Sequence, residues 1–362
     1  MASCVAVVLA SCSPKQAALN RVAADRVAAP PTTELPADLV AVQGAVYAEI
    51  GDLAPGSREA QDRQRSELAR TGLALEVRAK RSGLVLRYVP AGSFWMGSSV
   101  EDQQHMLRQL SMDYSTVKPN WFASAELGVK SERRHEVSFA RGSYVGKFEV
   151  SREEWERVMG GLPESSHFQH APADAPIEGL SWFDSQAFVT KLCALEGVPA
   201  GTYRLLTEAE WEYMCRAGTQ TAHYGGDLRL RGQSHAVGLG AIAWYSGNAE
   251  ARYEGGVDSR GWPGRELPIQ QAGVQRCGRK TPNAWGLHDT IGNVLEWCAD
   301  GFESEYPTSG EDPFVEPTNT ARVIRGGGWN GYAGFCRAAF RTRFVAESKN
   351  NVTGLRIARV SP

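Results

Sequence analysis

The chain has 362 residues, 42% of them hydrophobic and 22% charged, a composition close to that of an ordinary globular protein with one large domain or two smaller ones. This composition excludes wholesale disorder, a collagen-like repeat and a polytopic membrane protein. The 39 basic and 41 acidic residues leave a net charge of −2, so we expect no nucleic acid as a partner. The 38 glycines and 10 tryptophans predict many turns and large aromatic side chains rather than long regular helices.

The N-terminus, MASCVAVVLASC, resembles a bacterial lipoprotein signal. Its apolar run at residues 5–10 is too short to span a bilayer, and the LASC sequence that ends at Cys12 is similar to a lipobox. We therefore expect residues 1–12 to be a signal peptide with Cys12 as the lipidated residue. The protein would then be anchored by lipid to a bacterial membrane in the periplasm. The alternative is an apolar N-terminus with two incidental cysteines, because no Lys or Arg precedes the run.

Residues 13–82 are predicted to be a tether and a short helical segment. Residues 13–36 are rich in Ala, Pro and Thr, a composition typical of a linker that holds a domain away from a membrane. Residues 39–50 and 58–75 have the apolar spacing of helices. These two segments would form a helical pair or pack on the main domain.

The predicted main domain spans residues 83–362 and begins with short strands. Residues 83–97 indicate two strands around a Pro-Ala-Gly turn. Residues 135–139 and 144–150 have the same character. The first part of this domain is therefore predicted to contribute strands to a sheet.

Three helices are predicted to follow these strands, starting after Ser151, Ser181 and Thr207. Ser151 and Thr207 each have glutamate three residues later, which is the pattern of a capping box. After Gly218 turn residues recur every few positions. Few long helices, scattered strands and abundant glycine together predict an irregular α+β domain.

Eight segments of this domain resemble one known family, the formylglycine-generating enzymes or sulfatase-modifying factors. In chain order they are VPAGSFWMGS (89–98), YVGKFEVSREEW (144–155), PIEGLSWFDSQAF (176–188), YRLLTEAEWEYMCRAGT (203–219), AWYSGNA (243–249), PNAWGLHDTIGNVLEWCAD (282–300), RVIRGGGW (322–329) and GLRIAR (354–359). The resemblance covers about residues 83–361. It implies the family's fold, a C-type-lectin-like α+β domain with little regular secondary structure.

The resemblance also implies calcium in the GNVLEW segment. Asn293 and Glu296 place two side-chain oxygens a few residues apart, which suits a hard cation. The family's calcium site maps onto these two side chains together with the carbonyls of Ile291 and Val294. The alternative is a hydrogen-bonded buried turn without metal.

A second calcium site of the family maps onto the AWYSGN segment. The side chain of Asn248 and the carbonyl of Ala249 would be ligands, with Asp258 as the nearest further candidate. Residues 250–275 resemble an insertion relative to shorter members of the family. The expected cofactor is thus structural calcium.

The family's copper site lacks its residues in this chain. The resemblance implies an oxidase that binds Cu(I) through two cysteines after an RGGS-aromatic segment, and soft Cu(I) requires such thiolates. Here Gly328 replaces the serine and Gly331 replaces the first cysteine, so only Cys336 remains at a vestigial copper position. We therefore expect no bound copper and no copper-dependent formylglycine generation. Cys336 would instead pack internally, and it could form a disulfide with Cys215.

The segment after this position combines aromatic and arginine side chains, as binding hot spots do. The predicted binding groove consists of Trp329, Tyr332, Phe335, Arg325, Arg337 and Arg341. The alternative is that tryptophans of the family segments, above all Trp285 and Trp297, are core residues. The segment 100–134 is a second region in which specificity could reside.

The sequence predicts a periplasmic lipoprotein whose domain binds a protein or peptide partner as an accessory module. One alternative is a copper-independent enzyme that tailors a peptidic substrate, as relatives in siderophore maturation do. A third, weaker alternative is a true formylglycine-generating enzyme with a relocated site.

Overall fold

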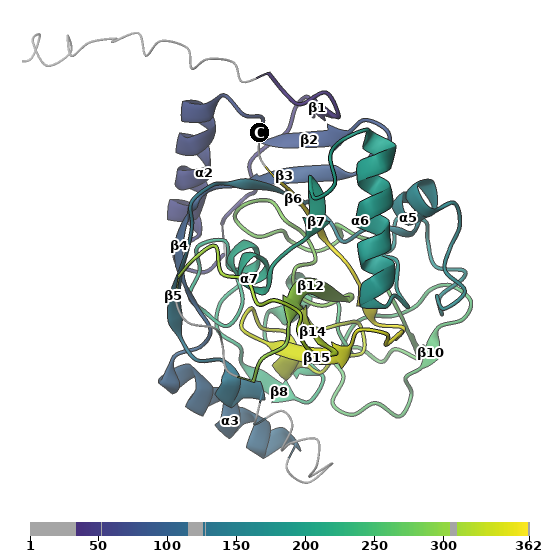
Figure 1. The fold of residues 1–362 in the computed structure, drawn as a ribbon. Helices are drawn as coiled ribbons and strands as arrows, with labels where there is room; N and C mark the ends of the chain where they lie inside the picture. Colours follow the sequence, from purple (N-terminus) through teal and green to yellow (C-terminus); the bar gives the residue numbers. More distant parts are fainter. Residues whose placement is uncertain (1–33, 52, 115–125, 127, 305–309, 361–362) are drawn as a thin grey trace, which may run out of the picture.

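The computed structural model describes residues 34–360 except 52, 115–125, 127 and 305–309 (Figure 1). The predicted signal peptide, Cys12 and the first part of the tether lie outside these described residues. Among the described helices none is both long and apolar enough to cross a membrane.

The largest element of the fold is a six-stranded sheet at the top of Figure 1. Its strands, in spatial order, are β1 (Leu39–Ala41), β2 (Glu76–Ala79), β3 (Val85–Val89), β6 (Ser143–Gly146), β17 (Ile357–Val360) and β7 (Tyr203–Leu205). Every pairing in this sheet is antiparallel. β17, which lies near the C-terminus, is inserted between β6 and β7, so the C-terminal segment joins these two strands into one sheet.

Two further sheets support the loops that follow. One consists of β15 (Arg341–Val345), β14 (Ala321–Arg325), β12 (Leu295–Gly301) and β16 (Thr353–Gly354). The other consists of β13 (Gly310–Glu311), β5 (His135–Phe139) and β4 (Gly92–Met96). Two short strand pairs are β8 (Leu230–Gly232) with β9 (His235–Ala236), and β10 (Val257–Asp258) with β11 (Gln271–Ala272).

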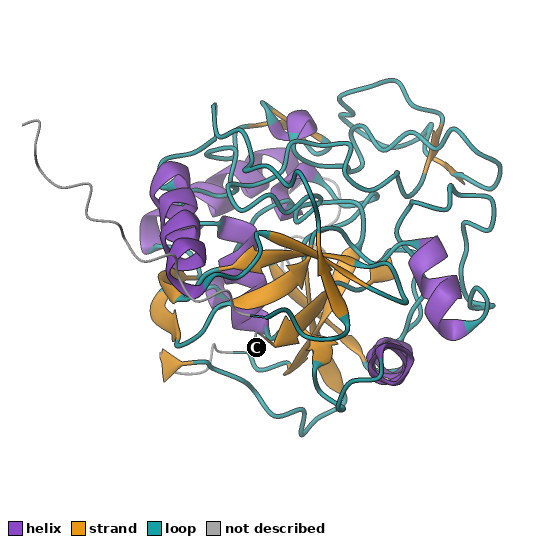
Figure 2. Ribbon diagram, turned by 90° about the horizontal axis from the view of Figure 1, so that it is seen from above, coloured by secondary structure: helices purple, strands orange, loops and turns teal. Residues whose placement is uncertain are grey.

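The helices lie around these sheets, and long loops fill the rest of the domain (Figure 2). They are α2 (Ser57–Thr71), α3 (Val100–Tyr114), α5 (Arg152–Met159), α6 (Trp182–Glu196) and α7 (Glu208–Arg216). Two single turns of 3-10 helix, η1 (Leu239–Ala241) and η2 (Ala333–Phe335), interrupt the loops. The α+β prediction with little regular structure is confirmed.

Local sequence explains where three of these helices start. Ser151, Ser181 and Thr207 each accept a hydrogen bond from the backbone N–H three residues later, and the acidic side chain at that position returns to the cap N–H. These capping boxes satisfy donors that a helix N-terminus leaves open. The two capping boxes predicted from sequence are confirmed, and α6 has a third with Asp184 in place of glutamate.

The domain begins earlier than the predicted boundary at residue 83. β1 and β2 extend the main sheet, and α2 packs against it, with Gln64 fully buried and bonded to the carbonyl of Tyr88 at 2.5 Å. The predicted helix over 58–75 is confirmed as α2. The predicted helix over 39–50 is wrong, because pairing of Leu39 with Ala79 draws this segment into the sheet.

The core of the domain is aromatic. Trp211, Trp285, Trp297 and Trp329 are among the largest fully buried side chains. The expectation that Trp285 and Trp297 are core residues is confirmed. These four tryptophans thus fill the interior between short helices and strands, which bury little surface against one another.

Candidate functional site

The loop at the position that the resemblance assigns to copper is closely packed around its glycines. A Cβ atom on Gly328 would lie 2.2 Å from Cγ2 of Val352, and one on Gly331 would lie 3.0 Å from the carbonyl oxygen of Gly328. Cys336 is fully buried, and burial raises the pKa of its thiol to about 12. A protonated thiol with no second sulfur beside it does not fit Cu(I).

The cysteines of the described chain are all free thiols. The predicted Cys215–Cys336 disulfide is therefore wrong. The Cys215 thiol donates to the carbonyl of Thr290 at 3.5 Å, and the Cys336 thiol points to the carbonyl of Tyr332 at 3.9 Å. Both cysteines are core residues, and each thiol faces a backbone carbonyl oxygen inside the protein.

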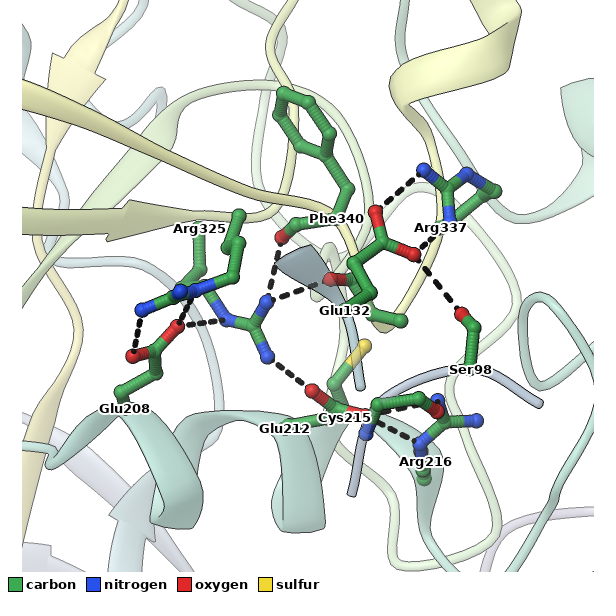
Figure 3. A network of polar contacts seen from close by, with 12 residues as sticks. Ser98, Glu132, Glu208, Glu212, Cys215, Arg216, Arg325, Arg337 and Phe340 are labelled. Atoms are coloured by element: carbon green, nitrogen blue, oxygen red, sulfur yellow. Dashed lines mark hydrogen bonds and ion pairs between the residues drawn. The ribbon is translucent and has the colours of Figure 1, made fainter. Parts of the chain in front are cut away.

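Two predicted groove arginines, Arg325 and Arg341, are buried in ion pairs with helix α7 (Figure 3 shows Arg325 between its carboxylates). Arg341 binds both oxygens of Glu208, at 2.7 and 2.8 Å. Arg325 donates to Glu212 and to the carbonyls of Ala339 and Phe340. These guanidinium groups hold the fold together and do not face a groove.

Glu212 is the centre of this network (Figure 3). It also accepts hydrogen bonds from the Arg216 side chain and from the Gly97 N–H, both at 2.8 Å. Burial alone would raise the pKa of Glu212, but Arg216 and Arg325 lower it below its ordinary value. The carboxylate is therefore ionised and pins α7, β4 and β14 together.

The third groove arginine, Arg337, forms a bidentate pair with Glu132 at 2.6 and 2.7 Å. Ser98 donates to the same carboxylate at 2.9 Å (Figure 3). Arg337 is 4% exposed and Glu132 is 1% exposed. The guanidinium of Arg337 is thus already paired inside the protein, and its place in a binding groove stays a prediction.

The predicted aromatic groove residues divide into two kinds. Trp329 is buried, and its Nε1 donates to the carbonyl of Asn351 at 2.8 Å, so its placement in a groove is wrong. Tyr332 and Phe335 are partly exposed neighbours with ring centroids 6.5 Å apart. Phe335 also stacks on Phe340 at 4.8 Å. Only these two aromatic residues of the predicted set reach the surface.

A cavity of about 300 Å³ lies close to this loop, between α3, the segment 220–229 and the residues after η2. Its lining includes the buried apolar side chains Met106, Leu228 and Ala339, half-buried Ala222 and the buried, ion-paired Arg216. Its exposed lining is polar and carries both signs of charge: Asp102, His105, Asp227 and Arg229. Arg337 also lines it, with its guanidinium turned to Glu132.

Gln109 of helix α3 forms hydrogen bonds to the opposite wall of this cavity. Gln109 accepts a hydrogen bond from the N–H of Leu230 at 2.9 Å and donates to the carbonyl of Leu228 at 3.3 Å. The segment 100–134 was predicted to carry specificity, and its α3 part does line the cavity. Residues 115–125 and 127 of that segment lie outside the described residues.

The side chains predicted to bind calcium in GNVLEW are engaged elsewhere. Glu296 forms an ion pair with Arg356 at 2.8 Å and accepts from Nε1 of Trp211 at 2.6 Å. Oδ1 of Asn293 accepts from the N–H of Gln275 at 2.8 Å. Glu296 is thus paired with an arginine and Asn293 with a backbone N–H, and the calcium site in this segment stays a prediction.

The remaining residues of the calcium predictions have the following contacts. The side chains of Ile291 and Val294, whose carbonyls are the predicted ligands, are fully buried in the core. Asn248 caps its own turn, accepting from the N–H of Tyr245 at 3.0 Å and donating to the carbonyl of Ala243. The carbonyl of Ala249 accepts from the N–H of Gly273 at 3.1 Å. Asp258, the further candidate, forms an exposed ion pair with Arg260.

A different group of acidic and thiol side chains could hold a metal ion. One ligand atom each from Glu149, Cys277 and Asp289 lies within 4.8 Å of the others. These residues come from three separate segments, so sequence spacing did not indicate their proximity. The sequence feature that could have indicated this group is Glu149, an acidic residue in the largely apolar segment YVGKFEVS, which leads from β6 to α5.

The irregular α+β fold, with its short strands and long glycine-rich loops, is that of the formylglycine-generating enzyme type. A family model described as "Sulfatase-modifying factor enzyme 1-like domain" matches residues 76–361, so the chain belongs to this family.

Two relatives illustrate the spread of this family. The chain is 25% identical over 246 residues to "Chaperone protein LppX" of Paenibacillus barcinonensis, covering 60% of this chain and 79% of that protein. It is 32% identical over 199 residues to the formylglycine-generating enzyme of Thermomonospora curvata, covering 51% of this chain and 55% of that enzyme. The chain thus spans about half the length of that enzyme.

Solved structures share the fold. The structure of PvdO from Pseudomonas aeruginosa superposes with a TM-score of 0.55 at 21% identity, covering 79% of this chain and 98% of that one. Treponema denticola variable protein 1 gives a TM-score of 0.54 at 22% identity, covering 77% and 95%. At this identity the likeness concerns architecture alone.

Proposed function

We propose that this protein is a binding module that holds an extended segment of a protein or peptide partner and does not carry out copper-dependent oxidation. The observation that carries the proposal is the open cavity beside α3, which has buried apolar side chains in its lining and charged side chains at its exposed part. This cavity offers space for a side chain of a ligand, whereas Gly328 and Gly331 lack the hydroxyl and thiol that the resemblance assigns to an oxidase.

The cavity fits a segment that inserts one apolar side chain. Its volume of about 300 Å³ is at the lower end of ligand pockets, and burying an apolar side chain against Met106 and Leu228 contributes roughly 1.5–3 kcal/mol. Asp227 and Arg229 at the exposed part carry opposite charges, so polar groups on either side of the inserted residue find partners. This arrangement favours a peptide over a purely apolar small molecule.

The relatives are compatible with an accessory role. One relative, with 79% of its length matched, is named a chaperone. We further propose that Cys12 is lipidated and anchors the domain to a membrane in the periplasm, which places the cavity where exported polypeptides pass. Replacing Cys12 by Ala is expected to move the protein from the membrane fraction to the soluble fraction of cell extracts. An unchanged distribution between the two fractions would contradict lipidation.

Selection of peptides from a random phage-displayed library on the purified protein tests the binding proposal. Ala222→Trp fills the cavity, whereas Ala187→Trp places the same ring on the exposed face of α6, on the other side of the molecule (Figure 1). Selected peptides are expected to bind the second variant like the parent and the first variant at least about tenfold more weakly, which corresponds to roughly 1.4 kcal/mol. Equal binding to both variants, or no enrichment at all, would contradict the proposal.

The alternative of a copper-independent tailoring enzyme is tested with the same peptides. Incubation in air followed by mass spectrometry is expected to return each peptide unchanged. A change in peptide mass that depends on the protein would contradict the binding proposal and show that the protein is an enzyme. Cu(I) titration of the reduced protein is expected to show no tight stoichiometric binding. Tight binding would support the alternative of a formylglycine-generating enzyme with a relocated site.

A further inference from the structure

Three potential metal ligands converge in the interior, away from the cavity. Glu149 lies between β6 and α5, Cys277 lies in the loop after β11, and Asp289 lies in the loop before β12. One ligand atom from each lies within 4.8 Å of the other two. The Cys277 thiol is 3.7 Å from Oε2 of Glu149. Such separations are close to those between ligands of a single small cation.

The carboxylate of Asp289 has an oxygen that the protein leaves without a partner. Oδ2 accepts from the N–H of Gly278 at 2.6 Å, whereas Oδ1 is buried and has no hydrogen-bond partner. Asp289 as a whole is 1% exposed. A buried acceptor without a donor is costly, so this oxygen calls for a proton or a cation.

Negative charge around this group exceeds positive charge. Besides Glu149 and Asp289, Glu296 acts on the group, and the cations that act on it are Arg356 and Lys280. Arg356 is already paired with Glu296 at 2.8 Å. Lys280 lies over the ring of Trp244 at 3.6 Å and donates to the carbonyl of Gly240.

This imbalance affects the protonation of all three groups. Burial, with the neighbouring carboxylates, raises the pKa of Glu149 well above its ordinary value. Burial raises the pKa of Asp289 to about 6. Burial and the nearby Glu149 raise the pKa of the Cys277 thiol. A divalent cation would reverse each of these effects, because it stabilises the deprotonated forms.

We propose that Glu149, Cys277 and Asp289 bind a zinc-class divalent cation. One thiolate with two carboxylates is a mixed donor set that suits a borderline cation such as Zn²⁺, whereas calcium takes oxygen ligands alone and Cu(I) favours several sulfur ligands. Cys277 is the member of the three that is partly exposed. The bound ion would link to one another the three loops that carry these ligands. Binding involves no redox step: the cation replaces the thiol proton and any carboxyl protons, which pass to solvent.

The first experiment measures binding of Zn²⁺ and Co²⁺ to the whole chain. One equivalent of Zn²⁺ is expected per chain, with proton release, and Co²⁺ is expected to show a thiolate-to-cobalt absorption band. Cys277→Ser is expected to abolish the band and weaken Zn²⁺ binding at least tenfold. Cys193→Ser is the matched control, because Cys193 is a buried thiol bonded to the backbone of Tyr203 and lies outside the group.

A second measurement requires no variant and stays valid where Cys277→Ser fails to fold. Alkylation of Cys277, followed by peptide mass mapping, is expected to slow at least tenfold with saturating Zn²⁺ and to remain unchanged with Ca²⁺. An unchanged rate with Zn²⁺, a cobalt complex without the thiolate band, or one equivalent of tightly bound Ca²⁺ in place of Zn²⁺ would each overturn the proposal. None of these outcomes bears on peptide binding at the cavity.

Discussion

Arginine side chains near the former copper position are structural because each meets a carboxylate inside the protein. Composition alone made Arg325, Arg337 and Arg341 resemble a binding surface, since arginines beside aromatic residues are typical of hot spots. Arg337 is paired with Glu132, whereas the partners of Arg325 and Arg341 are Glu208 and Glu212, which are four residues apart on α7 and project from the same face of the helix. Arg216 of the same helix neutralises Glu212 in part, and Arg325 and Arg341 supply the further buried cations that the two glutamates require.

The pair between Arg341 and Glu208 gives a direct test of this structural role. Arg341→Met leaves Glu208 buried with its bidentate partner gone, and we expect a loss of about 3–5 kcal/mol in the free energy of unfolding by urea. Arg343→Met, two residues along the same strand, is the control, because Arg343 is exposed and only stacks on Phe302. Its expected cost is below about 1 kcal/mol. If both variants lower the free energy of unfolding by the same amount, the buried ion pair contributes no more to stability than the exposed arginine does.

Asp300 predicts a pH dependence of stability. Burial and the nearby Glu208 raise its pKa from 3.8 to about 7, so the folded protein favours the protonated acid. The stabilising contribution of this group is therefore present below pH 3.8 and is lost as the pH rises through about 7.

Asp300→Asn removes this titration while keeping the shape of the side chain. The free energy of unfolding of the variant, minus that of the parent, is expected to increase as the pH rises from about 4 to about 8. Denaturant titrations at several pH values measure this difference. A difference that does not change with pH would mean that Asp300 is ionised throughout.

The loop between β14 and η2 is shaped by contact between elements that are distant in sequence. Val352, just before β16, occupies the space into which a side chain at position 328 would extend. Gly328→Ser is therefore expected to destabilise the domain by about 1–3 kcal/mol through overpacking. In a Val352→Ala background the same substitution is expected to cost at least about 1 kcal/mol less, because the clashing methyl group is absent. Thermal or urea unfolding of the four proteins measures this coupling, and strict additivity would refute the steric explanation.

Elements with local signals were predictable from the sequence. The helices after Ser151 and Thr207 have capping boxes within four residues, and the strands over 85–96 alternate around a turn signal, so no distant contact is needed to recognise them. The segment at 39–41 was predicted to be helical because its apolar spacing is ambiguous, and only pairing with β2 makes it a strand.

The candidate site was less predictable than the fold. The loss of the copper cysteine and serine was visible as Gly328 and Gly331. The cavity was not, because its lining comes from α3, the segment 220–229 and Ala339, which are brought together only by tertiary packing. The same holds for Glu149, Cys277 and Asp289, whose sequence separations exceed those of any common ligand motif. The ion pair between Glu296 and Arg356, which lies just before β17, was likewise not visible in the sequence.

At the scale of the whole molecule, the N-terminal region is part of the folded unit. Asp38 accepts from both Arg359 and Tyr203, and Trp285 donates to the carbonyl of Ala60 at 3.0 Å. These contacts join residues on either side of the predicted boundary at 83. The unit that folds therefore includes β1, α2 and β2.

A chain that begins at Glu34 is expected to unfold at the same temperature as the full protein. A chain that begins at Gly83 loses two sheet strands and leaves Arg359 and Arg87 without the carboxylates of Asp38 and Glu76, so we expect it to be insoluble or unfolded. Circular dichroism and size-exclusion chromatography of the two chains provide the comparison. A stable, cooperatively folding chain from Gly83 would restore the original domain boundary.

The free thiols of the described chain bear on how the protein matures and how it can be handled. Four of these five cysteines are buried, and none of the five is cross-linked, so no disulfide holds the described loops in place. We therefore expect the described domain to fold without an oxidising environment or a disulfide isomerase. It can be produced in the reducing cytosol of an expression host and kept in reductant during purification, conditions that would dismantle a small secreted domain stapled by disulfides.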